Sequence, residues 1–400
     1  MNNKRRVLGA VAGLMASVVS VGFLSSAHTQ TGYQPPVAVE TESFGEDSFA
    51  LGTLSSETGA LSRDLWRGAS VNSVDYLFDH IPARFDQPAM LGVMKRAMLS
   101  PGDAPIGSTD SLTGKKLMLL AEAGFYEDAS SIAELARGLS GQPELSQAIA
   151  FAELMRGDVV AACQRNANLN KGRNLPFWLK LRLLCYATTG ENAAADLTLG
   201  LLRERKLLSP AEDRLFGALV SGIDLKADIR PVTGFEYAAL RQLQLGIDLG
   251  ALDHANGAVL RALATEIKAP QQARVFAGEQ AMRRGIMSVG ELQSLFRSFT
   301  FAPERLAEAK ALMIQNRKNY LIDPLVYQAA AEMTAPEFAL DRQSLIGEAL
   351  RGAGGETRFI ALAKLYAPML QSADVVVNYA PYAREYALAG IVAGDMDLAT

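Results

Sequence analysis

Cys163 and Cys185 are the residues whose type and spacing most clearly allow chemistry, because two thiols can form a disulfide. Each lies in an expected helix next to a glycine turn, and residues 170–174 are expected to connect the two helices. Antiparallel helices joined there would place the two thiols at the same height along the helix axes, close enough to react. The N-terminus indicates export to an oxidising compartment, which favours the bonded pair. Two separate buried thiols are the alternative, and the lack of Cys-x-x-Cys spacing argues against a redox-active pair.

The other reactive residue types do not form a pattern that predicts catalysis. The histidines are His28, His80 and His254, and no two of them have the spacing of metal ligands. His80 is expected to cap or pack at a helix end. The sequence also lacks the Gly-x-Ser-x-Gly nucleophile turn and a phosphate-binding loop. We therefore predict no catalytic, cofactor-binding or metal-binding residue.

One carboxylate pair is the remaining candidate for acid–base chemistry. Glu122 and Glu153 occupy related positions in the first helices of two successive hairpins. The prediction is exposed, solvated charge at both positions. The alternative is a paired-carboxylate site of the kind that cleaves glycosidic bonds.

Composition places the chain among folded, helical proteins. It has 400 residues, of which 49% are hydrophobic and 20% are charged, and its net charge is −4. Alanine and leucine are frequent and β-branched runs are few, which favours packed helices. The basic residues form no long cluster after the N-terminus, so a nucleic-acid partner is not predicted.

The first 27 residues read as a secretory signal peptide. Lys4, Arg5 and Arg6 precede an apolar stretch over residues 7–24, and small residues follow it up to Ala27. Cleavage there would leave a chain without a membrane span and would place it in the periplasm of a bacterium. The alternative is an uncleaved inner-membrane anchor formed by residues 7–24. Residues 28–60 are acidic and rich in turn-forming residues, which predicts a disordered linker.

Three glycine turns set the architecture. Gly124, Gly157 and Gly190 have an equal spacing of 33 residues, from 124 to 157 and from 157 to 190. Apolar helical segments flank each of them. Such spacing is typical of helical hairpins stacked along one axis, so we predict an all-α fold and, more specifically, an α-solenoid of antiparallel hairpins.

The first of these units resembles a tetratricopeptide repeat. Gly124, Tyr126, Ala129, Ala136 and Pro143 match that family's pattern of a turn glycine, an aromatic residue, small helix-contact residues and a closing proline. The second and third units keep the glycine and an alanine five residues later, and they replace the aromatic residue by Val159 and Asn192. The resemblance is therefore to a degenerate repeat, over about residues 112–205.

The chain divides at a stretch without helical periodicity, Lys226 to Gly234. Residues 61–225 are predicted to form an N-terminal helical repeat region, and residues 235–400 a C-terminal one. Helical segments over 303–316, 336–351 and 357–370 are among those expected in the latter. Gly394 begins another turn shortly before Thr400, which favours a chain truncated at that point.

The resemblance implies a concave groove lined by the first helix of each hairpin. The residues expected to line it are Met118, Glu122, Gln147, Phe151, Lys180 and Leu184. The alternative is that Met118, Phe151 and Leu184 are core residues between the repeats. We predict a non-catalytic, exported scaffold that binds a protein or peptide partner in the cell envelope. The alternative is a cell-wall enzyme or its subunit, because soluble lytic transglycosylases also contain a helical superhelix.

Overall fold

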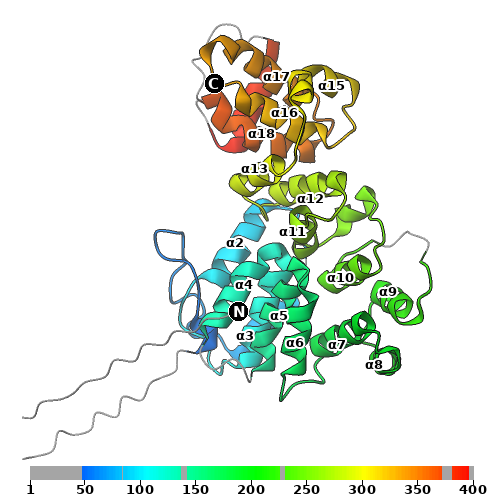
Figure 1. Ribbon diagram of the computed structural model, residues 1–400. Helices are drawn as coiled ribbons and strands as arrows, with labels where there is room; N and C mark the ends of the chain where they lie inside the picture. Colours follow the sequence, from blue (N-terminus) through cyan, green and yellow to red (C-terminus); the bar gives the residue numbers. More distant parts are fainter. Residues whose placement is uncertain (1–46, 83, 137–141, 226–229, 372–380, 396–400) are drawn as a thin grey trace, which may run out of the picture. The chain divides into compact units, whose positions relative to one another are not determined.

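The structure, a computed structural model, describes residues 47–395 apart from 83, 137–141, 226–229 and 372–380 (Figure 1). Within these ranges the chain forms helices α1 to α19 with short 3-10 and π segments, and an isolated bridge between Ser70 and Ile106 is the only β pairing. The predicted all-α class is confirmed. The predicted signal peptide and the linker up to residue 46 lie outside the described residues, as do residues 396–400.

The helices follow one another with short connections. Those up to the predicted boundary are α1 (Val71–Asp79), α2 (Pro88–Leu99), α3 (Asp110–Leu120), η2 (Ala121–Phe125), α4 (Tyr126–Leu135), α5 (Pro143–Arg156), α6 (Val159–Ala167), α7 (Pro176–Thr189), α8 (Asn192–Glu204) and α9 (Pro210–Ser221). After it come α10 (Gly234–Gln242), α11 (Gly257–Thr265), α12 (Gln271–Arg283), α13 (Val289–Arg297), α14 (Pro303–Ala307), α15 (Ala309–Gln315), α16 (Ile322–Glu332), α17 (Ala339–Arg351), α18 (Glu356–Gln371) and α19 (Ala383–Ala393).

Local sequence signals explain where many of these helices begin. Proline occupies the first turn of α2, α5, α7, α9 and α14, where its missing N–H costs no hydrogen bond. Capping boxes open α9, α10 and α13, each made by a Ser or Thr and a Glu three residues later. The helix expected over 303–316 is instead two helices, because the chain leaves helical geometry at Glu308.

The last part of the predicted linker is ordered around Phe49, which is 1% exposed and lies in the short 3-10 helix η1 (Ser48–Ala50). Trp66 contacts the Phe49 ring edge-on at 5.7 Å. The buried ammonium of Lys116, on α3, donates to the carbonyls of Phe49 (2.8 Å) and Leu51 (3.1 Å). Apolar burial and one buried cation therefore fix this segment on α3.

Each of the three predicted turn glycines lies between two helices. Gly157 ends α5 and Gly190 ends α7 in left-handed conformation, with φ of 86° and 77°. Gly124 has φ of 104° and lies inside the π segment η2, where the chain bends between α3 and α4. Positive φ is the conformation that glycine adopts without strain, which accounts for the residue type at all three positions.

The disulfide between Cys163 and Cys185 is confirmed. It joins α6 to α7, and the two Cα atoms are 5.7 Å apart. Asn166, three residues after Cys163, donates from its side-chain amide to the buried carbonyl of Trp178 (2.9 Å) and connects the same two helices. The second and third hairpins are thus held together both covalently and by a buried hydrogen bond.

Glycines also connect the first hairpin to α11. A β-carbon on Gly257, the first residue of α11, would lie 1.9 Å from the carbonyl oxygen of Ala123 in η2. A β-carbon on Gly124 would lie 2.5 Å from the Ile286 side chain. Both distances are far inside van der Waals contact, so α11 and Ile286 can approach this turn only because neither glycine carries a side chain.

The later helices pack on one another after α11. Helix α12 contacts α11, α13 and α18, while α16 packs against α13, α15 and α17 (Figure 1). Buried aromatic residues are part of this core, with the rings of Phe296 and Tyr327 5.9 Å apart. Among the described helices, none is both long enough and apolar enough to cross a membrane.

Replacing both Cys163 and Cys185 by serine should lower the free energy of unfolding by about 3 kcal/mol, because the disulfide constrains the unfolded chain over a 22-residue separation. Urea unfolding of the purified protein measures this. A reductant should lower the midpoint of the natural chain and leave that of the double variant unchanged. An unchanged midpoint in the reduced natural chain would contradict the prediction.

Substituting Gly257→Ala should destabilise the fold by at least about 2 kcal/mol, because the new methyl group overlaps the Ala123 carbonyl. Gly200→Ala, inside α8, is the matched control: its β-carbon meets no atom within 4 Å, so the change should be neutral or slightly stabilising. Thermal unfolding of both variants would decide. Equal melting temperatures would show that the contact between Gly257 and η2 is not needed.

Candidate functional site

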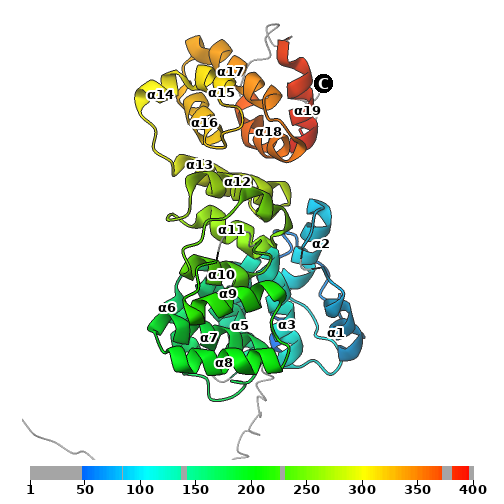
Figure 2. The same ribbon diagram turned by 90° about the vertical axis from the view of Figure 1, so that its right-hand side faces the viewer.

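The chain's own helices cover much of the groove predicted from the repeat pattern. Phe151 and Leu184 are fully buried. A β-carbon on Gly234, at the start of α10, would lie 2.5 Å from the Phe151 ring, so α10 sits directly on it. Helices α9 and α10 contact α7, and α10 also contacts α5 (Figure 2). Met118 and Gln147 are partly exposed. A role in partner binding stays a prediction for these positions.

The charged members of that set, Lys180 and Glu122, face one buried network. Lys180 Nζ donates to both carboxylate oxygens of Glu212 on α9, at 2.7 and 2.8 Å. Ser209 Oγ links this pair to Glu236 on α10, donating to it at 2.8 Å. Burial raises the pKa of Glu122, an effect that Lys180 opposes and Glu212 reinforces. The network fastens α9 and α10 onto the hairpins.

Glu153 is not solvated as predicted. It is 8% exposed, and Arg165 on α6 binds both of its carboxylate oxygens, at 2.5 and 3.1 Å. A bidentate arginine uses most of the acceptor capacity of the carboxylate. The prediction of exposed charge is therefore wrong at this position, because the first helix of the second hairpin is buried over nearly its whole length.

A second carboxylate pair, which the sequence pattern did not indicate, lies between α12 and α16. Glu279 is 1% exposed, and Asp323 is held by Arg358 of α18 through two hydrogen bonds, at 2.5 and 2.6 Å. Burial, together with the neighbouring Asp323, raises the pKa of Glu279 well above its ordinary value. Burial and the neighbouring carboxylate thus favour the protonated form of Glu279. The two residues are far apart in sequence, so no local motif could reveal them.

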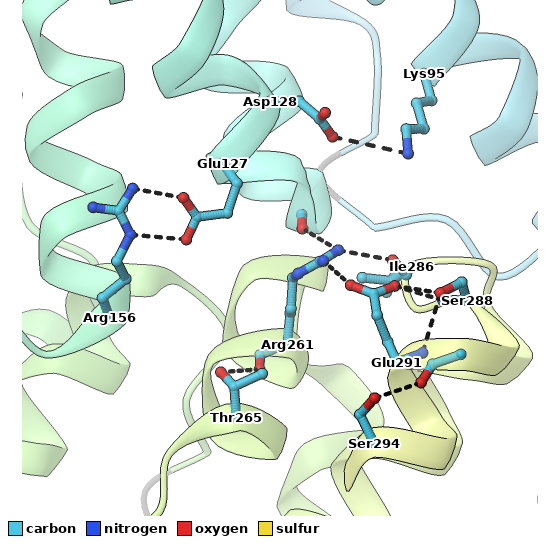
Figure 3. A network of polar contacts seen from close by, with 12 residues as sticks. Lys95, Glu127, Asp128, Arg156, Arg261, Thr265, Ile286, Ser288, Glu291 and Ser294 are labelled. Atoms are coloured by element: carbon cyan, nitrogen blue, oxygen red, sulfur yellow. Dashed lines mark hydrogen bonds and ion pairs between the residues drawn. The ribbon is translucent and has the colours of Figure 1, made fainter. Parts of the chain in front are cut away.

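A partly exposed polar network centres on Arg261 of α11 (Figure 3). Its guanidinium donates to the Ile286 carbonyl at 3.1 Å and to the Gly124 carbonyl at 3.5 Å, and it pairs with Glu291 of α13. Glu291 also accepts from the backbone and hydroxyl of Ser288, at 2.7 and 2.9 Å. One arginine therefore fixes the relative positions of η2, α11 and α13.

Two further ion pairs flank this centre. Arg156 binds Glu127 at 2.5 and 2.8 Å, and Lys95 lies 3.8 Å from Asp128. Figure 3 shows them on the α4 side of the Arg261 network. Both pairs are exposed to solvent, so each contributes at most about 1 kcal/mol to stability.

A groove of about 510 Å³ opens beside the Arg261 network, between α11, α12 and α13; we call it the α11–α13 groove. Its apolar lining is Ala264, Ile267, Met287, Gly290 and Leu295, its hydroxyl lining is Thr265, Ser288, Ser294 and Ser298, and its charged lining is Arg274 and Glu291. Met287 and Leu295 are nearly fully buried and form the floor, whereas Ile267 is 84% exposed at the rim. Its volume lies within the range of ligand-binding clefts.

Arg274 is the unusual member of this lining. It is 6% exposed, and burial lowers its pKa. Its Nε donates to the Ala264 carbonyl at 3.3 Å, and its Nη2 donates to Ser298 Oγ at 3.2 Å. Glu291, the carboxylate in the same groove, is already paired with Arg261. Arg274 is thus a buried cation that lines the groove, and its hydrogen-bond acceptors, the Ala264 carbonyl and the Ser298 hydroxyl, are both neutral.

A second groove, of about 680 Å³, lies between α7 and α8. It also contains an arginine, Arg182, whose Nη2 donates to the Arg173 carbonyl at 2.8 Å. Arg182 is more exposed than Arg274, and Asp196 and Glu204 line the same groove. Burial, together with the nearby Arg173, lowers the pKa of Arg182.

Comparison with known protein families, with characterised proteins and with solved structures finds no match to this chain.

The described residues contain no group of three or more His, Cys, Asp or Glu side chains placed to hold a metal ion. His80 caps α1, with its Nδ1 2.7 Å from the Tyr76 carbonyl oxygen. The α11–α13 groove is therefore the candidate site on the basis of its geometry alone.

Substituting Glu279→Gln should flatten the dependence of stability on pH. The folded pKa of Glu279 lies above the unfolded value, so the folded chain keeps a proton that the unfolded chain loses. That contribution is complete at low pH and is lost as pH rises above about 4, the ordinary range of a glutamate. Urea midpoints between pH 5 and 8 should fall for the natural chain and fall less for the variant.

The control for this experiment is Glu304→Gln, which removes an exposed carboxylate from α14. Its profile should parallel that of the natural chain. Parallel profiles for all three proteins would mean that Glu279 is ionised in the folded state, contrary to the account given above.

Proposed function

We propose that this chain is a non-catalytic, exported helical-repeat protein that binds a protein or peptide partner in the cell envelope. The observation that carries the proposal is the α11–α13 groove, whose apolar floor, hydroxyl rim and buried arginine fit a peptide. The groove predicted from the first helices is largely filled by α9 and α10. Partner binding is accordingly assigned to the later groove.

We further propose that the three hairpins α3–α4, α5–α6 and α7–α8 are degenerate tetratricopeptide-like repeats in a short solenoid. The equal spacing of Gly124, Gly157 and Gly190, each with positive φ between two helices, supports this. In this arrangement the hairpins form the scaffold on which α9, α10 and α11 pack. Their role is to hold the later groove rather than to bind the partner directly.

Export is the third part of the proposal. The basic and apolar N-terminus is typical of a signal peptide. The Cys163–Cys185 disulfide supports an oxidising compartment such as the periplasm. Both observations favour the same route, and they are independent of each other.

Photo-crosslinking in intact cells tests partner binding. A benzophenone amino acid at Ile267 or at Ser294, both in the α11–α13 groove, should give a crosslinked product of defined size. The same amino acid at Glu304, which is exposed on α14, should not. Products from all three positions, or from none, would contradict binding in this groove.

The same purified protein should release no muropeptides from peptidoglycan. Release by the natural chain would favour the alternative, a cell-wall enzyme, over a binding protein. Mass spectrometry of the soluble fraction measures it.

A further inference from the structure

Arg274 carries a buried charge without an acid to compensate it. Among the described residues no carboxylate forms an ion pair with it, and burial alone perturbs its pKa. The face of the Phe299 ring lies 5.0 Å from its guanidinium carbon, and Ala264 and Ser298 supply neutral acceptors. Neutral groups and an aromatic face offset only part of the cost of removing a cation from water.

The other buried cations of the chain differ from Arg274 in where they lie. Arg284 and Lys116 are likewise buried and donate to backbone carbonyls. Neither of them lines the α11–α13 groove. Arg274 is therefore the one of these three buried cations that meets the groove.

The position of Arg274 makes an external counter-charge possible. The residue comes from α12 and lines the α11–α13 groove, whose lining also includes the buried side chains of Met287 and Leu295. An anion that reaches the guanidinium would thus bring its own apolar part against an apolar floor. A carboxylate attached to an aliphatic group fits this combination of neighbours.

We propose that the α11–α13 groove binds the C-terminal end of a partner peptide, with its free carboxylate on Arg274 and the apolar side chain of its last residue on Met287 and Leu295. This inference rests on the proposed function, since it names the part of the partner that the groove recognises. Exposed hydroxyls of Ser294 and Ser298 lie along α13 in the same lining. They accept hydrogen bonds from the N–H groups of the last residues of the peptide.

A peptide end explains the groove better than an inorganic anion. Phosphate is recognised by several donors or cations at once, and the groove supplies one guanidinium among apolar side chains. A terminal carboxylate carries a single charge, which one arginine fork matches. The adjoining hydroxyls could donate to a bare ion, but their oxygens can also accept, and a peptide backbone supplies N–H donors as well as acceptors for them.

Fluorescence anisotropy tests the inference on the full-length mature protein. The probe is a fluorescein-labelled hexapeptide, Gly-Ser-Gly-Ser-Ala-Leu, with a free C-terminal carboxylate, and its C-terminal amide is the matched ligand. The free acid should bind roughly tenfold or more tightly than the amide, because the amide removes a charged hydrogen bond at Arg274. Arg274→Met should abolish this preference, whereas Arg182→Met, the same change in the α7–α8 groove, should leave it intact.

Because Arg274→Met removes structural hydrogen bonds as well, Ser294→Phe provides an independent test. Ser294 is exposed, and the larger ring fills the groove without touching the core. This variant should melt like the natural chain and lose peptide binding. The inference is overturned if the acid and amide bind equally, if the natural chain does not bind the acid, or if octanoate competes and the peptide does not. If the groove gives a crosslinked product but the acid and the amide bind equally, recognition of a terminal carboxylate is rejected. Partner binding in the groove, which is the proposed function, would still hold.

Discussion

The close approach of Gly257 to the Ala123–Gly124 backbone is the constraint on which the candidate site depends. The start of α11 lies against η2 at a distance that leaves no room for a β-carbon at Gly257. Arg261, one turn further along α11, then reaches the Gly124 and Ile286 carbonyls and pairs with Glu291. Because α11 and α13 form two walls of the groove, the glycine contact fixes the groove relative to the hairpins.

Arginines repeatedly satisfy the ends of helices in this chain. Arg241 of α10 donates to the carbonyls of Leu154 and Met155 near the C-terminus of α5, at 3.0 and 3.1 Å. Arg274 likewise donates to Ala264 in the last turn of α11. Cations at helix C-termini are favourable because the last carbonyls carry partial negative charge. Arg241 also pairs with Glu266 at 2.9 Å, whereas Arg274 forms no ion pair with any described residue and lines the α11–α13 groove.

Much of the fold followed from local sequence patterns. The helical segment expected over residues 357–370 lies at nearly the observed bounds of α18, Glu356–Gln371. The cysteine pairing followed from the positions of Cys163 and Cys185 on either side of a helix connection. Helix periodicity depends on residues within one or two turns of each other, and the cysteine pairing depends on two helices that follow one another directly in the chain.

The candidate site could not be predicted in the same way. Arg274 sits in a helix with ordinary spacing, and its isolation from acids depends on which helices pack around it. Burial of Phe151 under Gly234 is equally non-local, since it joins α5 to α10 across the predicted boundary. Glu279 and Asp323 come together only when α12 and α16 are assembled. Tertiary contacts of this kind leave no periodic trace in the sequence.

The most direct test observes the Arg274 guanidinium itself. Side-chain Nε–H resonances of arginine can be recorded by NMR on ¹⁵N-labelled protein and assigned through Arg274→Lys and Arg182→Lys variants. If the groove recognises a terminal carboxylate, titration with the free-acid hexapeptide should shift the Arg274 signal and leave the Arg182 signal in place, while the amidated peptide shifts neither. An Arg274 signal that does not move on addition of the acid, or that moves equally with the amide, would contradict the account.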